Sequence, residues 1–365
     1  MKIDIVIGLG YGDEGKGRVV DHLSTSDSTV IRFNGGHQAG HTVHGEKHKH
    51  VFSSIGSGAL KEADTYISRF CTFYPPGFMN ELHALQTAGY DPAVYVDSEA
   101  MVTIPYDIEF NKMTEGNMGK RAHGSVGVGF GKTLERNEKH FKIFVRDLKY
   151  PNILREKLRI AEELYYPLLK VTDEEMEDFM SACAACVSNI YITDERKFFA
   201  GRTGHLIFEG AQGVMLDMDY GFFPHVTRSH TTSRNAVELI SKYYPVEDVS
   251  MHYVTRAYTT RHGNGPFNYT PITLKNNELE TNVPNEWQGS LRVGELSLPD
   301  LQYAVDCDRR HSSGISTCDN LYMTCLDQRT EDLIPSPLVI SKYLNMDEVF
   351  ASFSPGPDPI IKIKR

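Results

Sequence analysis

A glycine-rich loop directly after an apolar segment is the feature that most restricts the fold of this chain. The apolar segment Ile3 to Ile7 runs into Gly8-Leu9-Gly10-Tyr11-Gly12-Asp13-Glu14-Gly15-Lys16-Gly17-Arg18. Gly10, Gly15 and Lys16 satisfy the pattern G-x-x-x-x-G-K, in which backbone N–H groups close around phosphate oxygens and the lysine adds a positive charge. The sequence therefore predicts a strand, a phosphate-binding loop and a helix that includes Val19 to Leu23.

This loop departs from an ordinary nucleotide-hydrolysing P-loop at two points. The pattern normally continues with a Ser or Thr whose hydroxyl binds Mg²⁺, but Gly17 stands there. Asp13 and Glu14 lie inside the loop, where acids repel phosphate unless they bind a metal or transfer protons. The alternative, a glycine-rich turn with solvated acids, fits less well because a strand pattern precedes the loop and a helical pattern follows it.

Further apolar runs predict parallel strands that are buried on both faces. They are Val30 to Phe33, Val94 to Val96, Leu206 to Phe208 and Met251 to Val254. Helical patterns lie between the runs, and the clearest are Asn152 to Lys170 and Asp173 to Ile190. This alternation predicts an α/β fold, with a single large domain over residues 1–365 around a central, mostly parallel sheet with crossover helices.

Glycine-rich loops recur at Gly35 to Gly40, Gly124 to Gly131 and Gly210 to Gly213. Loops after the carboxyl ends of parallel strands form the ligand crevice, so we expect a composite site built from these loops. In the first of them, His37 and His41 are four residues apart, which on a helix could hold a metal. The neighbouring glycines disfavour a helix and no third ligand is evident. A lone loop histidine is usually a surface residue, but beside a phosphate loop His41 is better interpreted as an acid or a phosphate-contacting group.

Charge and composition exclude several classes of function. The net charge of −10, from 38 basic and 48 acidic residues, repels a nucleic-acid backbone, although a small phosphorylated ligand remains allowed. Neither a membrane span nor a cleavable leader is evident, so we expect a cytoplasmic protein without membrane contact. The six cysteines follow no secreted pattern and are interpreted as reduced thiols. Cys183 and Cys186 form a C-x-x-C within a helical pattern, which favours a buried helix face over a metal site.

The first two glycine loops together, Gly12-Asp13-Glu14-Gly15-Lys16-Gly17 and Gly35-Gly36-His37-Gln38-Ala39-Gly40-His41-Thr42, resemble those of the adenylosuccinate synthetases. Further matches follow in the family's order. They are Phe208-Glu209-Gly210-Ala211-Gln212-Gly213, Leu216-Asp217, Val226-Thr227, Thr231-Thr232, Ala257-Tyr258-Thr259-Thr260-Arg261, Gly265-Pro266-Phe267, Leu326-Asp327 and Gly356-Pro357-Asp358. The resemblance implies a P-loop-NTPase-like adenylosuccinate synthetase fold and a homodimer.

The resemblance also implies a reaction. A ligase of this family removes the N1 proton of a purine, transfers a γ-phosphoryl group to the 6-oxygen, and lets the amine of L-aspartate displace the phosphate. By resemblance, Asp13 is the general base and a Mg²⁺ ligand, and the Gly40 carbonyl completes the metal coordination. His41 is the general acid and Lys16 neutralises phosphates, so that catalysis combines positioning with electrostatic stabilisation.

Binding residues carry over in three groups. The triphosphate group comprises Gly12, Asp13, Glu14, Gly15, Lys16, Gly17, Gly40, His41, Thr42, Asp327, Gly356 and Pro357. The purine monophosphate group comprises Asn34, Gln38, Ser125, Val126, Gln212 and Thr227. The aspartate group comprises Gly289, Ser290 and Arg292.

Departures from the family pattern cluster on substrate recognition. Gln38 replaces an asparagine, Val126 replaces a threonine in the loop G-T-T-G-R-G-I-G-P, and Cys325 stands where a lysine stacks on guanine. The arginine that crosses the dimer interface to the nucleotide phosphate has no clear counterpart, and Lys139, His140 or Lys142 is nearest. Only Arg292 remains in the aspartate loop to clamp a dicarboxylate.

A chain that keeps the phosphoryl-transfer residues and changes both base pockets resembles the short, phage-type branch of the family. That branch joins aspartate to dGMP, with ATP as donor and GTP less favoured, to form N6-succino-2-amino-2'-deoxyadenylate for diaminopurine DNA. If phage-encoded, the protein would work in the host cytoplasm. Two alternatives stay open. One is an ordinary adenylosuccinate synthetase, which uses IMP, aspartate and GTP, and the other is a catalytically inactive nucleotide-binding regulatory protein.

Overall fold

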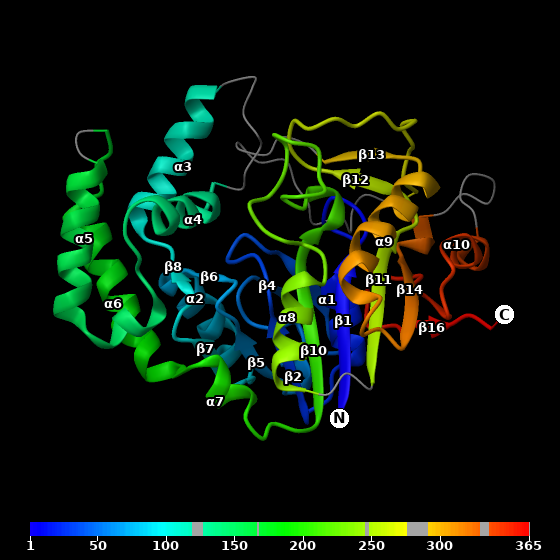
Figure 1. Ribbon diagram of the computed structural model, residues 1–365, viewed down its shortest axis with the longest axis horizontal. Helices are drawn as coiled ribbons and strands as arrows, with labels where there is room; N and C mark the ends of the chain where they lie inside the picture. The colour runs from blue at the N-terminus through cyan, green and yellow to red at the C-terminus, as the bar shows by residue number, and fades with distance from the viewer. Residues whose placement is uncertain (119–126, 166–167, 245–247, 276–290, 329–335, 365) are drawn as a thin grey trace.

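A ten-stranded sheet forms the centre of the molecule, shown in Figure 1. The computed structural model describes residues 1–118, 127–165, 168–244, 248–275, 291–328 and 336–364. The strands of the sheet lie in the order β16 (Ile361–Lys362), β15 (Glu348–Ala351), β14 (Cys318–Thr324), β11 (Val249–Arg256), β1 (Lys2–Gly8), β10 (His205–Gly213), β2 (Ser28–Arg32), β5 (Asp64–Ile67), β7 (Val94–Asp97) and β9 (Tyr191–Thr193). Neighbouring strands are parallel except for the pair β15 and β16. The predicted α/β class is confirmed.

Ten α-helices and three small two-stranded sheets surround this sheet in the described residues. The helices are α1 (Lys16–Leu23), α2 (Pro75–Thr87), α3 (Pro105–Met118), α4 (Phe130–Lys139), α5 (Pro151–Tyr165), α6 (Asp173–Asn189), α7 (Glu195–Phe199), α8 (Arg234–Tyr243), α9 (Leu298–Ser312) and α10 (Pro337–Leu344). The small sheets pair β3 (His41–His44) with β4 (Lys49–Phe52), β6 (Thr72–Phe73) with β8 (Met101–Val102), and β12 (Thr259–Arg261) with β13 (Arg292–Gly294).

Helices cover both faces of the sheet, as the apolar strands require. Val6 of β1 packs with Val19 and Val20 of α1 on one face. Ile5 and Ile7 point to the opposite face and join the core that contains residues of α8 and α9. Figure 1 shows α8 and α9 in front of the sheet, and α3 to α6 grouped at one end of the molecule beyond β7.

The five strands that the sequence predicts are present, with most boundaries within two residues of those predicted, except that β10 continues five residues beyond Phe208 to Gly213. The predicted helix from Asn152 to Lys170 corresponds to α5, which is described over Pro151–Tyr165. Cys183 and Cys186 are buried on α6, as expected for a helix face. In the part of the chain that the structure describes, no helix is both long enough and apolar enough to cross a bilayer.

Candidate active site

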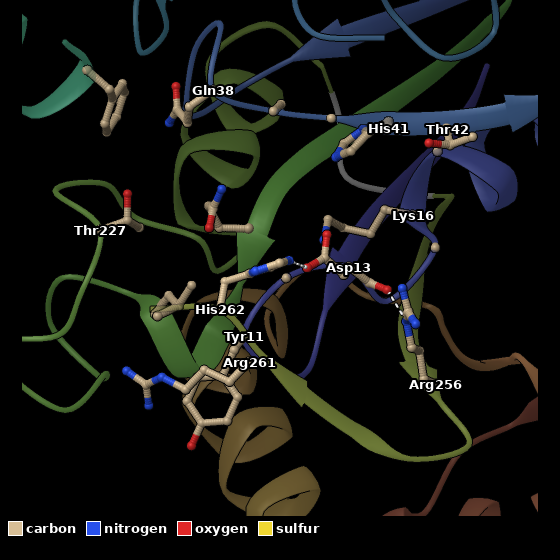
Figure 2. A pocket seen from close by; sticks show the side chains of 18 of the residues that line it. Tyr11, Asp13, Lys16, Gln38, His41, Thr42, Thr227, Arg256, Arg261 and His262 are labelled. Atoms are coloured by element: carbon tan, nitrogen blue, oxygen red, sulfur yellow. Dashed lines mark hydrogen bonds and ion pairs between the residues drawn. The ribbon is translucent and has the colours of Figure 1, made fainter. Parts of the chain in front are cut away.

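A cavity of about 720 Å³ opens at the carboxyl ends of the central strands. Its lining comes from the loops after β1, β2, β10, β11 and β14, together with α3 and α4. The predicted composite, loop-built site is therefore present. Figure 2 shows that Asp13, Lys16 and His41 lie near one another on one side, and that Thr227 lies across from them.

The phosphate loop is held in shape by Glu14. The Oε1 atom of Glu14 accepts hydrogen bonds from the backbone N–H groups of Gly10 (3.0 Å) and Gly12 (2.8 Å). Its Oε2 atom lies 2.5 Å from Nζ of Lys16, and both side chains are at most 4 % exposed. Glu14 thus neutralises the phosphate-binding lysine inside the protein, and the acid does not point into the space that a phosphate would fill.

Asp13, by contrast, presents its carboxyl group to the cavity. Its backbone has a φ of 63°, and Arg256 donates a hydrogen bond from Nε to its carbonyl oxygen. The carboxylate Oδ2 lies 3.4 Å from Nε2 of His262, and the side chain is 25 % exposed. Burial raises the pKa of Asp13 even though Arg256 and His262 lower it. A raised pKa is the shift that a carboxylate needs to accept a proton near neutral pH.

His41 begins β3 and is oriented by a buried glutamate. Its Nδ1 atom lies 2.6 Å from Oε1 of Glu209 on β10. Burial would raise the pKa of Glu209, but Arg32, His41 and Ser57 lower it to about 2, so the carboxylate is ionised. An ionised acceptor at Nδ1 fixes the proton on that nitrogen and leaves Nε2 for a substrate. Burial lowers the pKa of His41 in the absence of ligand.

Gly17 has a physical reason to replace the usual Ser or Thr. A Cβ atom at this position would lie 2.7 Å from Cβ of His41 and 2.9 Å from Oγ of Ser57. Real Cβ atoms do not approach other atoms this closely, so a side chain at position 17 would displace the histidine. The position of His41 therefore requires a glycine at position 17, and this glycine cannot supply the hydroxyl of an ordinary P-loop.

Unusual backbone conformations cluster at the cavity. Among the described residues other than glycine, five have a positive φ, and Asp13, Gln212 and Cys325 are three of them. All three line the cavity, at the carboxyl ends of β1, β10 and β14. Backbone strain of this kind persists where the surrounding structure fixes it and is frequent at functional sites.

The residues expected to bind the purine monophosphate divide into two groups. Gln38, Gln212 and Thr227 line the cavity, and both polar atoms of the Gln38 amide are buried without a hydrogen-bond partner. Asn34 does not line it, because both ends of its amide bond the backbone of Ala211 and the residue is 1 % exposed. The structure therefore corrects the expected contact at Asn34 to a role in holding the loops after β2 and β10 together.

The aspartate and base segments are only partly as expected. Arg292 donates to the carbonyl oxygens of Gly263 (2.5 Å) and Gly265 (2.8 Å), and it does not line the cavity. Arg292 thus supports the loop after β12 through the backbone, and its contact with a dicarboxylate stays a prediction. Asp327 lines the cavity, whereas Pro357 lines a separate hollow beside α1.

The remaining expected residues also have definite places. Gly12, Gly15, Gly17, Gly40 and Thr42 line the cavity, while Gly356 lies just beyond the lining residue Pro355. Ser125, Val126, Gly289 and Ser290 lie outside the described residues.

Among the cavity residues without a predicted role are three cationic or titratable side chains close to Asp13 or to the loops around it. Arg256, Arg261 and His262 end or follow β11 and β12, and all three line the cavity. Figure 2 shows His262 directed at Asp13 and Arg256 at the backbone of the same residue. For Arg256 the available signal was its position directly after the predicted strand Met251 to Val254, at the edge where the other loops meet. Arg261 and His262 lie at or just after the end of β12, which the sequence did not predict.

The donor set fits Mg²⁺, which prefers carboxylate and carbonyl oxygens and retains several waters. Asp13 offers an ionisable carboxyl group within the cavity, and the exposed Gly40 offers a backbone carbonyl beside His41. A cation near Asp13 would also offset the burial that raises the pKa of its carboxyl group. Mg²⁺ in this position would supply charge neutralisation and orientation of phosphate oxygens.

Comparisons with known proteins agree with this geometry. A family model described as adenylosuccinate synthetase matches residues 5–330. The chain is 33 % identical over 295 residues to the adenylosuccinate synthetase of Coxiella burnetii, which covers 75 % of this chain and 65 % of the relative. It is 31 % identical over 321 residues to that of Chlorobium chlorochromatii, covering 82 % and 73 %. The chain thus spans about 65 % of the length of the first of these relatives.

Two solved structures share the fold. Fully ligated adenylosuccinate synthetase from Plasmodium falciparum superimposes with a TM-score of 0.81 at 20 % identity and full coverage of both chains. The succinoaminodeoxyadenylate synthetase of cyanophage S-2L, bound to dGMP and to dATP as an energy donor, gives a TM-score of 0.68 at 16 % identity, covering 99 % of this chain and 95 % of that one.

Proposed function

The chain belongs to the adenylosuccinate synthetase family, and on that premise we propose that it is an ATP-dependent ligase that joins L-aspartate to dGMP. The product is N6-succino-2-amino-2'-deoxyadenylate, with ADP and phosphate released. The enzyme is a cytoplasmic homodimer in this proposal.

One observation carries the choice of substrate. Two departures from the family's base recognition, Gln38 and Cys325, line the same cavity as the unchanged Asp13, Lys16 and His41. The buried amide of Gln38 has neither donor nor acceptor satisfied, and an unpaired buried amide costs free energy until a ligand meets it. A 2-amino group on the purine is a donor that an amide oxygen can accept. Cys325 leaves no cation at the position where the family's lysine stacks on guanine, which supports ATP over GTP.

In the proposed mechanism, Asp13 is the general base and His41 is the general acid. Asp13 takes the N1 proton of the purine, and the γ-phosphoryl group passes from ATP to the 6-oxygen. The negative charge of the γ-phosphoryl group beside His41 favours the protonated imidazolium form, which the Glu209 carboxylate already supports through Nδ1. The Nε2–H group of His41 then donates a hydrogen bond to the 6-oxygen. Lys16 leaves its ion pair with Glu14 and binds the phosphates of ATP instead. The amine of aspartate then attacks C6, and the bond from C6 to the phosphorylated oxygen breaks to release phosphate.

A substrate matrix tests the proposal. Purified protein is incubated with L-aspartate, Mg²⁺ and each of dGMP, GMP and IMP, with ATP or GTP as donor, and the succinylated product and released phosphate are measured. We expect dGMP with ATP to give the highest kcat/KM. Exclusive turnover of IMP with GTP overturns the choice of dGMP, and tight nucleotide binding without turnover favours a regulatory protein.

A second candidate is adenylosuccinate synthesis from IMP and GTP. It is favoured by the names of the curated relatives at 31–33 % identity and by the TM-score of 0.81 to the enzyme from Plasmodium falciparum. Fold and chemistry are the same in both candidates, so the substrate matrix distinguishes them directly.

A further inference from the structure

Cations around the cavity have different partners. Six lysines and arginines of the described residues line it: Lys16, Arg18, Lys132, Arg228, Arg256 and Arg261. Lys16 and Arg18 belong to the phosphate loop and α1, and Arg256 and Arg261 donate to backbone carbonyl oxygens. Lys132 and Arg228 differ from these four, because each pairs with a glutamate on α4.

Lys132 can exchange its partner at low cost. Its Nζ atom lies 3.1 Å from Oε2 of Glu135 and 4.2 Å from the ring centroid of Phe110, and the side chain is 19 % exposed. The other oxygen of Glu135 lies 3.0 Å from Nζ of Lys139. Both lysines lower the pKa of Glu135 against its partial burial. If Lys132 turned to an anion in the cavity, Glu135 would keep Lys139 as its counter-charge.

Arg228 approaches the same region from the opposite wall. It directly follows Thr227 in the segment after β10, and its Nη2 atom lies 2.6 Å from Oε2 of Glu138 on α4. The two side chains are 37 % and 57 % exposed, and an ion pair so exposed contributes only about 0–1 kcal/mol. A guanidinium binds phosphate through two parallel hydrogen bonds, which such a weak pair does not prevent.

A rigid base holds α4 in place. One turn after Lys132, Arg136 forms a fully buried pair with Asp107 of α3, with two N–O distances of 2.9 Å. The helix begins after Gly129, whose N–H donates to Asn111 at 3.1 Å. Lys132 therefore extends from a fixed element, and a fixed element binds an anion with less loss of conformational entropy.

We propose that Lys132 and Arg228 bind the 5'-phosphate of the purine monophosphate substrate, both from the subunit that supplies Asp13 and His41. This inference rests on the proposed function in so far as the acceptor is a purine nucleoside monophosphate. The dianionic phosphate displaces Glu135 and Glu138 from the two cations, while α4 stays in place. The phosphate subsite is then complete without a cation from a second subunit.

Kinetics of Lys132→Met and Arg228→Gln test the clamp. We expect the KM for the purine monophosphate to rise about 10-fold or more in each, since a hydrogen bond to a charged group contributes about 1.5–3 kcal/mol. The kcat and the KM for ATP should stay within threefold. Matched controls are Lys112→Gln, which removes a similar lysine–glutamate pair on α3, and Arg234→Gln, which removes an exposed arginine–aspartate pair. Both should match the wild type.

Two further measurements separate a phosphate contact from general damage. With deoxyguanosine, which lacks the phosphate, the variants should bind as the wild type does. Glu138→Gln frees Arg228 and should lower the KM for the monophosphate, by at most about fivefold. An unchanged monophosphate KM in both cation variants overturns the clamp, and so does a larger effect of Lys139→Gln.

Mixed dimers test the subunit of origin. Asp13→Asn and Lys132→Met chains are co-expressed and heterodimers are isolated. Rates are measured at monophosphate concentrations well below the wild-type KM, where Lys132→Met is slow although its kcat is nearly normal. If both groups act in one subunit, no restored site exists and the heterodimer is no faster than Lys132→Met. Recovery toward half of the wild-type activity places Lys132 in the neighbouring subunit and overturns the assignment.

Calorimetric measurement of dGMP and IMP binding distinguishes a failure of the phosphate clamp from a failure of the proposed function. If the wild type binds either nucleotide without turnover, the ligase proposal fails while the variants still test the clamp by affinity. If neither nucleotide binds, both proposals are overturned.

Discussion

His41 works through a partner that lies 168 residues away in the chain. Glu209 holds its Nδ1, and Ser57 holds Glu209 through its N–H (3.0 Å) and its hydroxyl. Arg32 is the nearby cation, 3.9 Å from Oε2. In the proposed reaction the acid is therefore a unit of several side chains, in which Glu209 is a positioning residue.

Glu209→Gln should lower kcat by about 10-fold or more and leave the KM for ATP within threefold. The amide still fills the space but no longer supports an imidazolium. The pH dependence of kcat and the melting temperature are measured together, because loss of the carboxylate leaves Arg32 without its counter-charge. A normal kcat with a normal pH profile would remove Glu209 from the proposed chemistry.

Asp13→Asn and His41→Ala should each lower kcat by about 10² to 10⁴-fold, the range for general acid–base groups. Asparagine is chosen at position 13 because φ is 63° there, and asparagine tolerates that conformation better than alanine does. Single-turnover phosphoryl transfer checks both variants. A variant that turns over near the wild-type rate takes no part in proton transfer.

At the residue scale, the sequence predicts the groups that local motifs contain. Asp13, Lys16, Gly40 and His41 follow from glycine-loop patterns, and all four line the cavity. The role of Glu209 could not be predicted, because its side-chain contact with His41 depends on tertiary packing. The backbone acceptors of Arg292, Gly263 and Gly265, could not be predicted for the same reason, since they are set by the fold of the loop.

At the element scale, α2 fixes the turn that supports this unit. Glu81 of α2 accepts hydrogen bonds from the N–H groups of Ser53, Ser54 and Ile55. Ser57 follows two residues later and contacts Glu209. A buried carboxyl group on one helix thus anchors the loop that carries a partner of the active-site glutamate.

Glu81→Gln should flatten the pH dependence of stability. Burial raises the pKa of Glu81 to about 7, although the three N–H donors lower it. Between its ordinary pKa of 4.5 and about 7, the folded state keeps a proton that the unfolded state releases, so stability falls as pH rises through this window. Melting temperatures from pH 4.5 to 8 check this, with exposed Glu177→Gln as control. An equal slope in wild type and Glu81→Gln contradicts it.

Arg292→Ala should raise the KM for aspartate on the order of 10-fold, through two lost charge-assisted hydrogen bonds. Arg292 holds the carbonyl oxygens of Gly263 and Gly265, next to the cavity residue His262. Initial rates at varied aspartate give the KM. If it does not change, aspartate does not bind beside this loop.

Element types were predictable where a pattern was long, and less so elsewhere. β1 and β10 contain the apolar runs Ile5 to Ile7 and Leu206 to Phe208, whereas β14 reads Cys-Asp-Asn-Leu-Tyr-Met-Thr and β9 has three residues. The polar start of β14 belongs to a strand only because β11 and β15 pair with it on both sides. Pairing partners, and not the local sequence, decide such segments.

At the scale of the whole molecule, the cavity joins parts of the chain that are far apart. Its lining includes α3 and α4 from the helical end and five loops from the sheet. A ligand in the cavity therefore contacts both regions and stabilises the folded state as a whole, by RT ln(1 + [L]/Kd).

Substrates should raise the melting temperature in a concentration-dependent way. At 100 times Kd the stabilisation is about 2.7 kcal/mol. We expect dGMP to raise the melting temperature more than IMP at equal concentration, and Lys132→Met to reduce the shift by dGMP. Calorimetric scans at several concentrations check this. A larger shift with IMP than with dGMP contradicts the proposed specificity.

Gly17 prevents a simple evolutionary change from the proposed ligase to a P-loop hydrolase. A mutation to Ser at this position would supply the metal hydroxyl of a hydrolase, but its Cβ would collide with His41 before that hydroxyl could be used. A descendant of this chain could gain the serine only after losing the histidine, and the intermediate would perform neither reaction. The contact between α1 and β3 therefore works as an evolutionary lock, which ties the phosphate loop to the acid that it serves.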